Sequence, residues 1–138
     1  MGAWGIGNFE NDDALDWVYE LEKSNDLSMV LDALNAINHG EPAPDMSGAY
    51  HDASDCAMAL AAAEVIAALR GSPLPGLPEE VAAWVEAYRH LALNKTVLEE
   101  ARSALSAILK ESELQELWAE TDEYESWRVV VADLRRRL

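Results

Sequence analysis

The chain has 138 residues, half of them apolar, and its formal net charge at pH 7 is −16. This length is typical of a single domain with a core of its own, and the apolar content excludes an intrinsically disordered chain. The strong negative charge opposes binding to nucleic acid and to anionic membrane surfaces, so we expect neither as a partner.

The first nine residues predict an ordered strap rather than a flexible tail. Three glycines alternate there with Trp4 and other apolar side chains, and an acidic helix start follows at once. We expect Trp4 to anchor the strap, Met1–Phe9, against the core. A phosphate-binding loop is excluded, because the glycine order matches no nucleotide fingerprint and Glu10, Asp12 and Asp13 crowd the helix N-terminus that a phosphate needs.

Hydrophobic periodicity predicts helices along almost the whole chain. Apolar residues recur at positions i, i+3, i+4 and i+7, and proline, glycine and capping residues mark the breaks. Thr96 and Ser112 are each followed three residues later by Glu or Gln, which predicts two helix starts. We therefore expect an all-α fold, one domain over residues 1–138, with helices over residues 11–23, 26–38, 52–70, 78–92, 96–110, 113–120 and 123–137.

The segment from Ala53 to Leu69 is expected to form the central helix. Eight of its seventeen residues are alanine, and it is apolar on nearly all sides, which is typical of a buried helix. Glu64 interrupts it, and a buried carboxylate must be paired, hydrogen-bonded or protonated. We expect backbone amides or a tryptophan N–H of the strap to donate to Glu64, so that Trp4, Asn11 and Glu64 lock the N-terminus in place. A general acid/base or a metal ligand is the alternative role for Glu64.

Acidic residues are distributed unevenly along the chain. Residues 1–64 hold 13 of the 26 acids and a single base, Lys23, whereas residues 65–138 hold the other 13 acids and nine bases. A concentrated negative field favours a cationic partner. The candidate partner-binding residues are Asp12, Asp13, Asp16, Glu20, Asp52 and Asp55. The first-turn acids also complement a helix dipole, so a solvated acidic face is the simpler alternative.

Other chemistry has weaker support in the sequence. The single cysteine, Cys56, opens an apolar helix face and is expected to pack rather than to react, and no disulfide framework exists. No signal peptide or membrane-spanning run is recognisable, so we expect a cytoplasmic protein. No metal-ligand motif or cofactor fingerprint is present, and we expect neither a metal nor a cofactor.

The opening Met-Gly-Ala-Trp-Gly-x-Gly-x-Phe-Glu-Asn-Asp-x-Ala-x-Asp-Trp resembles the start of an uncharacterised bacterial family known only as a domain of unknown function. The resemblance continues through residues 61–68, Gly71 and Leu77-Pro78 and covers essentially the whole chain. It implies a compact helical bacterial protein, but no reaction, cofactor or partner. The positions that it places in a shared core pattern are Trp4, Asn11, Asp12, Asp16 and Glu64.

Two classes of function follow from these residues. The first is a non-catalytic interaction protein, inhibitor-like, immunity-like or regulatory, or a DNA mimic, whose acidic residues bind a basic partner. The alternative is an enzyme or metal-binding protein that uses a carboxylate cluster of Asp12, Asp16, Glu64 and Asp52, with His51 nearby. A protein that self-associates through an exposed apolar face is a third possibility, and we expect a monomer or a weak homo-oligomer.

Overall fold

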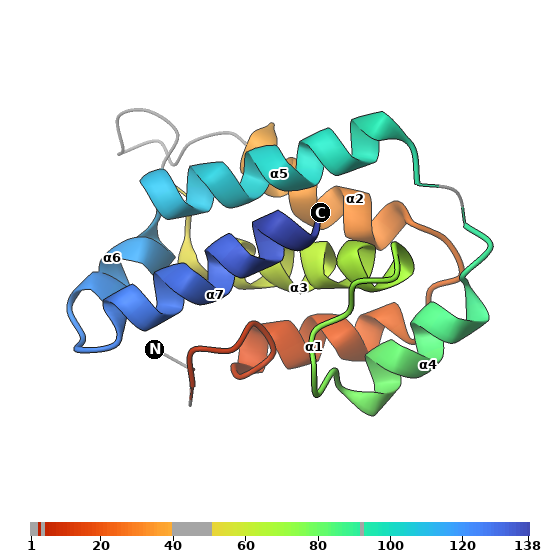
Figure 1. The fold of residues 1–138 in the computed structure, drawn as a ribbon, viewed down its shortest axis with the longest axis horizontal. Coiled ribbons are helices and arrows are strands. Elements are labelled where there is room, and N and C mark those ends of the chain that lie inside the picture. The colour runs from red at the N-terminus through yellow and green to blue at the C-terminus, as the bar shows by residue number, and fades with distance from the viewer. Residues whose placement is uncertain (1–2, 4, 40–50, 92) are drawn as a thin grey trace.

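Seven α-helices make up most of the residues that the computed structural model describes, which are 3, 5–39, 51–91 and 93–138 (Figure 1). No β-strand forms within these ranges, although Ala3 and Asn11 make an isolated antiparallel bridge. The expected all-α fold with one compact domain is confirmed. In chain order the helices are α1 (Asp12–Leu21), α2 (Ser28–Asn38), α3 (Ala53–Leu69), α4 (Glu79–Ala87), α5 (Lys95–Lys110), α6 (Glu113–Ala119) and α7 (Tyr124–Arg137).

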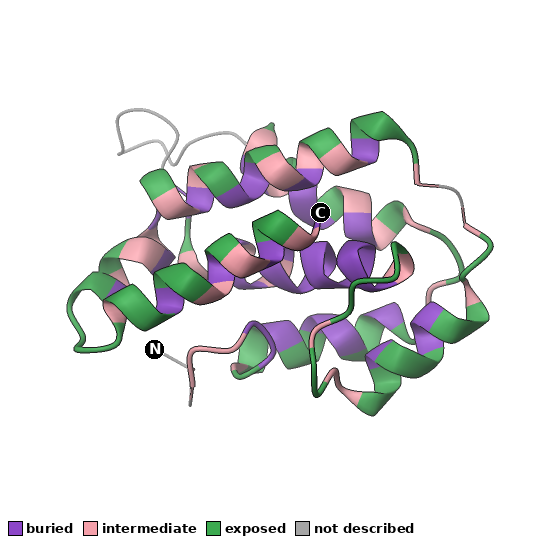
Figure 2. Cartoon of the chain, viewed as in Figure 1, coloured by how far each residue is buried: buried purple, intermediate pink, exposed green. Residues whose placement is uncertain are grey.

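The alanine-rich helix α3 is the centre of the fold, as its composition predicts. Each of the other six helices contacts it, and every residue from Ala59 to Ala68 is buried. Figure 2 shows α3 buried on all sides, whereas the outer helices alternate between buried and exposed positions. The small alanine side chains let the surrounding helices approach the α3 backbone closely, so a single helix can serve as the core for six others.

Local signals set most helix boundaries. Ser112 caps α6 as predicted, with its hydroxyl accepting from the Gln115 amide at 3.0 Å. Helix α3 ends in a Schellman motif, in which the Ser72 amide donates to the Ala67 carbonyl at 2.9 Å. Gly71 has a φ of +95° in this motif, a conformation that favours glycine.

The end of α4 and the cap of α5 differ from the prediction, whereas the other helix ends agree with it within two residues. Helix α4 ends at Ala87 rather than at residue 92, and the chain beyond it packs Leu91 and Leu93 against the core outside any helix. Helix α5 is capped by Asn94 rather than Thr96, because the Asn94 side chain accepts from the Val97 amide at 2.9 Å. Asparagine is at least as favourable an N-cap as threonine, so α5 begins after Asn94, which precedes Thr96 in the chain.

No helix within the described ranges is both long enough and apolar enough to cross a bilayer.

Candidate functional site

Glu64, on α3, is the only Asp, Glu, Lys or Arg of the described residues that is buried. Its carboxylate is bound by side chains from the strap and from α7. The Asn8 side-chain amide donates to its carboxylate at 2.7 Å. Arg137, on α7, donates from both terminal guanidinium nitrogens, at 2.9 and 3.1 Å, to its two oxygens. Glu64 has 0% of its surface exposed, and the Arg137 side chain 10%. This bidentate ion pair compensates both charges and joins α7 to α3, and the hydrogen bond from Asn8 joins the strap to α3.

These donors differ from those expected from the sequence. The strap does contribute a partner, but it is the side chain of Asn8 rather than a backbone amide or a tryptophan N–H. The counter-ion of Glu64 is Arg137, the last of three successive arginines at the end of α7, and it was not among the expected partners. Burial lowers the pKa of Arg137, but the hydrogen bonds and negative charges of Glu64 and Asp133 outweigh it and raise that pKa. Trp4, the expected anchor, lies outside the described residues.

Glu10, the residue after the strap, fixes the conformation of the strap through two hydrogen bonds with Gly7. The Glu10 carboxylate accepts from the Gly7 amide at 3.1 Å, while the Glu10 amide donates to the Gly7 carbonyl at 3.0 Å. A Cβ at Gly5 would overlap this carboxylate, so glycine there leaves room for it. Asn11 then caps α1, accepting from the Ala14 amide at 2.8 Å. The turn directs Asn8 and Phe9 into the core, where both are buried.

A cavity of about 240 Å³ lies between the strap, α1, α3, α6 and α7. Its wall is mainly apolar and includes two tryptophans, with a few polar residues. The described residues that line it are Ala3, Gly5, Ile6, Gly7, Asn8, Asn11, Asp13, Ala53, Ser54, Ala57, Leu60, Leu114, Leu117, Trp118 and Trp127.

Asn8 belongs to both the Glu64 network and the cavity wall. Its residue exposure is 2%, and its amide nitrogen must face Glu64, because a carboxylate accepts and does not donate. Its amide oxygen, Oδ1, is the one buried side-chain polar atom of the described residues that has no hydrogen-bond partner. A buried acceptor without a donor costs about 1–3 kcal/mol, so this oxygen marks a place where a donor is favoured.

Of the predicted acidic residues, Asp13 lines this cavity, and the others lie on α1 and at the start of α3. Asp12, Asp13, Asp16 and Glu20 are exposed on α1, and Asp52 caps the N-terminus of α3. The Ser54 hydroxyl donates to Asp13 at 3.2 Å and so joins the two acidic helix starts. Burial, and then the charge of Asp52, raises the pKa of Asp55 above its ordinary range. We call the surface formed by Asp12, Asp13, Asp16, Glu20, Asp52 and Asp55 the acidic face.

The structure does not assemble the alternative cluster of Asp12, Asp16, Glu64 and Asp52. Glu64 is buried and bound by Asn8 and Arg137, whereas the three aspartates are exposed. Across the described ranges, no three His, Cys, Asp or Glu side chains are grouped closely enough to hold a metal ion.

Cys56 and His51, which neighbour the acidic face in sequence, offer no nucleophile. Cys56 is fully buried, and burial raises the pKa of its thiol to about 12, so the reactive thiolate is scarce at neutral pH. Its Sγ lies 3.9 Å from the His51 carbonyl, and that carbonyl also accepts from the Glu113 amide at 2.8 Å. Both residues hold the start of α3 against α6.

Comparison with known proteins identifies the family but no activity. No curated protein and no solved structure matches the chain. Residues 2–129 match the family described as Domain of unknown function (DUF4259), a range that contains Asn8, Glu64 and the whole lining of the cavity. The chain therefore belongs to the DUF4259 family.

Proposed function

We propose that this protein is a non-catalytic interaction protein whose acidic face binds a basic protein partner. An inhibitory or a regulatory role is compatible with such a surface. The observation that carries the proposal is the hydrogen bond from Ser54 to Asp13, because it brings the acidic starts of α1 and α3 into one continuous surface.

The pairing of charges supports this reading. Within the described residues, no basic side chain pairs with Asp12, Asp13, Asp16, Asp52 or Asp55, although Glu20 pairs with Lys23. Most of the bases are engaged elsewhere. Lys95, Arg128 and Arg136 pair with acids on their own helices, Arg89 pairs with Glu86 of the preceding helix, and Arg70 and Arg102 donate to the Leu138 carbonyl. The negative charge of the acidic face is therefore largely uncompensated within the protein and can attract a basic partner.

The raised pKa of Asp55 points the same way. Burial is the larger cause of that shift and the charge of Asp52 adds to it, so a cationic partner would relieve the like-charge part of the cost of ionising Asp55. A surface that is unfavourable alone and favourable in a complex is typical of a binding site.

A lysine oligomer of about nine residues tests the proposal by calorimetry in about 20 mM and about 300 mM salt. We expect binding at low salt that weakens by at least about tenfold at high salt, because exposed charges are screened beyond about one Debye length. A glutamate oligomer of equal length is expected not to bind.

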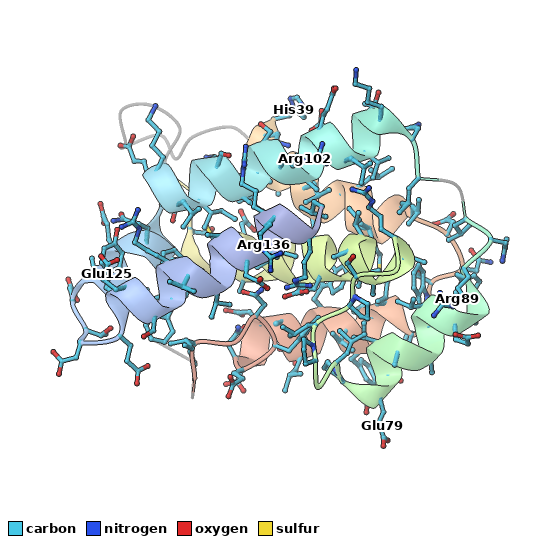
Figure 3. The ribbon with its side chains drawn as sticks, in the orientation of Figure 1. His39, Glu79, Arg89, Arg102, Glu125 and Arg136 are labelled. Carbon is cyan, nitrogen blue, oxygen red and sulfur yellow. The ribbon has the colours of Figure 1, made fainter. Side chains whose placement is uncertain are left out.

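A pair of charge-matched variants locates the binding surface. The test variant carries D12N, D13N, D16N and E20Q, and the control carries D32N, E79Q, E80Q and E111Q. The control residues are exposed on α2, on α4 and after α5, and Figure 3 shows Glu79 pointing away from the fold. Both variants lose four charges, two of them from the first turn of a helix. We expect a loss of about tenfold in affinity for the test variant and about twofold for the control. Equal losses would show that total charge, and not the acidic face, attracts the oligomer.

A further inference from the structure

We propose that the cavity beside the acidic face receives an arginine side chain of the basic partner. This inference rests on the proposed function and goes beyond it, because it names the group that the partner inserts. One mainly apolar cavity carries it, because the lining includes both Asn8, whose buried side-chain oxygen has no partner, and the acidic Asp13.

The composition of the wall suits a side chain with an apolar stem and a charged end. Leu60, Leu114 and Leu117 contribute aliphatic surface, and Trp118 and Trp127 contribute aromatic surface. Long basic side chains bury their methylene groups along such surfaces and keep the charged end beside polar groups. Tryptophan is also the aromatic residue that attracts a cation most strongly.

Two residues of the lining, Asn8 and Asp13, have acceptors with capacity for a further donor. Asn8 Oδ1 has no donor within the described chain, and Asp13 receives a single hydrogen bond, from the exposed Ser54. The Asn11 side-chain oxygen, by contrast, is already used to cap α1. A ligand with several N–H groups and a positive charge complements this set, whereas an anion would meet Asp13 and the rest of the acidic face.

Arginine fits these acceptors better than lysine does. Its planar guanidinium presents five N–H donors in a fixed fork, stacks on aromatic rings and is more weakly hydrated than an ammonium group. It therefore loses less on entering a partly closed site and can donate to an amide oxygen and a carboxylate together. The cavity, about 240 Å³, is also smaller than the roughly 300–1,000 Å³ that is typical of sites for drug-sized ligands and cofactors. A single large side chain is the appropriate size.

Two lysine oligomers of equal length and charge test the inference, one of them with arginine at its central position. Calorimetry at low salt is expected to show that the arginine-containing oligomer binds about tenfold more tightly. Electrostatic attraction to the acidic face alone predicts equal affinities, because the net charges are the same.

Variants that fill the cavity locate the arginine. Ala53→Leu and Ala57→Leu each extend a lining residue without changing the charge, and Ala132→Leu makes the same substitution at an exposed position outside the lining. We expect both filling variants to abolish the preference for arginine while the affinity for the all-lysine oligomer stays within about twofold. Ala53 is half-buried, so Ala53→Leu keeps the test available if Ala57→Leu fails to fold by circular dichroism.

The outcomes separate this inference from the proposed function. If neither oligomer binds, the proposed function is wrong and the arginine site is wrong with it. If the two oligomers bind equally, or if the preference persists in the folded filling variants, the acidic face binds basic partners but the cavity does not receive arginine. A preference that is lost on filling the cavity and kept in Ala132→Leu supports the site.

Discussion

Glu64 carries a carboxylate with no exposed surface, so its energy depends entirely on the groups that contact it. Asn8 supplies one hydrogen bond and Arg137 two. Arg137 also donates to Asp133 at 2.9 Å and to the Ser72 carbonyl at 3.1 Å, so one guanidinium connects α7 to α3 and to the turn that follows α3. Such pairs add little over a well-packed apolar core, but breaking one leaves an uncompensated buried charge.

Arg137→Ala is therefore expected to lower the free energy of unfolding by about 3–5 kcal/mol. Urea denaturation followed by circular dichroism measures this loss. The matched control is Arg136→Ala, because Arg136 is the next residue on α7, is 75% exposed and pairs with Asp133 at the surface. The control should cost about 1 kcal/mol or less.

A compensating double variant separates the buried charge from simple packing loss. Replacing Glu64 by Gln and Arg137 by Met removes both charges and keeps a side-chain oxygen that can accept from Asn8, so we expect it to recover most of the stability that Arg137→Ala loses. If Arg137→Ala lowers the free energy of unfolding no more than Arg136→Ala does, the ion pair between Glu64 and Arg137 does not stabilise the fold.

The sequence predicted the burial of Glu64 but not its partners. An all-round apolar neighbourhood on α3 is a local signal, whereas Asn8 and Arg137 lie 56 and 73 residues away. Three arginines end the chain's last helix in succession, and the direction of each depends on how α7 packs. The cavity was likewise invisible, because its wall combines the strap with four helices.

At the scale of elements, prediction was most successful where the signal is local. Apolar stripes and capping residues lie within a few positions of the boundary that they set, and six of the seven expected helices match the observed ones within about two residues at each end. The exception is α4, which ends at Ala87 because packing of Leu91 and Leu93 against the core takes precedence over continued helical periodicity.

Helices α2 and α5 are joined by a polar contact that is expected to depend on pH. Asn38 donates to the Glu100 carboxylate at 2.7 Å, and His39 lies 3.2 Å from it. The hydrogen bond from Asn38, and then that from His39, lowers the pKa of Glu100 below its ordinary range. A carboxylate with a lowered pKa stabilises the fold above its ordinary pKa, and that stability is lost as the pH falls through the lowered value.

Glu100→Gln should therefore destabilise the protein by about 1 kcal/mol at pH 7, and the difference from the native chain should shrink as the pH falls below about 4. Urea denaturation at a series of pH values provides the measurement. Glu99→Gln is the control, since Glu99 is exposed and pairs only with the highly exposed Lys95, at 3.8 Å. A difference for Glu100→Gln that stays constant down to pH 3 would contradict an ionised contact between α2 and α5.

At the scale of the whole molecule, like charges outnumber opposite ones. The chain has 26 acidic and 10 basic residues, and six of the bases pair with an acid three or four positions away in the sequence. Self-repulsion therefore opposes the folded state more strongly than surface ion pairs support it, because an exposed pair contributes about 0–1 kcal/mol. The composition alone predicted this imbalance, but the formation of the acidic face depends on how α1 packs beside the start of α3.

Added sodium chloride is consequently expected to raise the midpoint of thermal unfolding by a few degrees between about 20 mM and about 300 mM, because screening weakens repulsion over distances beyond roughly 8–10 Å. Circular dichroism at increasing salt measures the shift. The variant with D12N, D13N, D16N and E20Q should show a smaller shift than the variant with D32N, E79Q, E80Q and E111Q, although each has lost four charges. That order is expected only if repulsion is concentrated on the acidic face. Equal shifts in the two variants would mean that the repulsion is spread over the whole surface. A midpoint that falls with added salt would mean that attraction within ion pairs outweighs the repulsion.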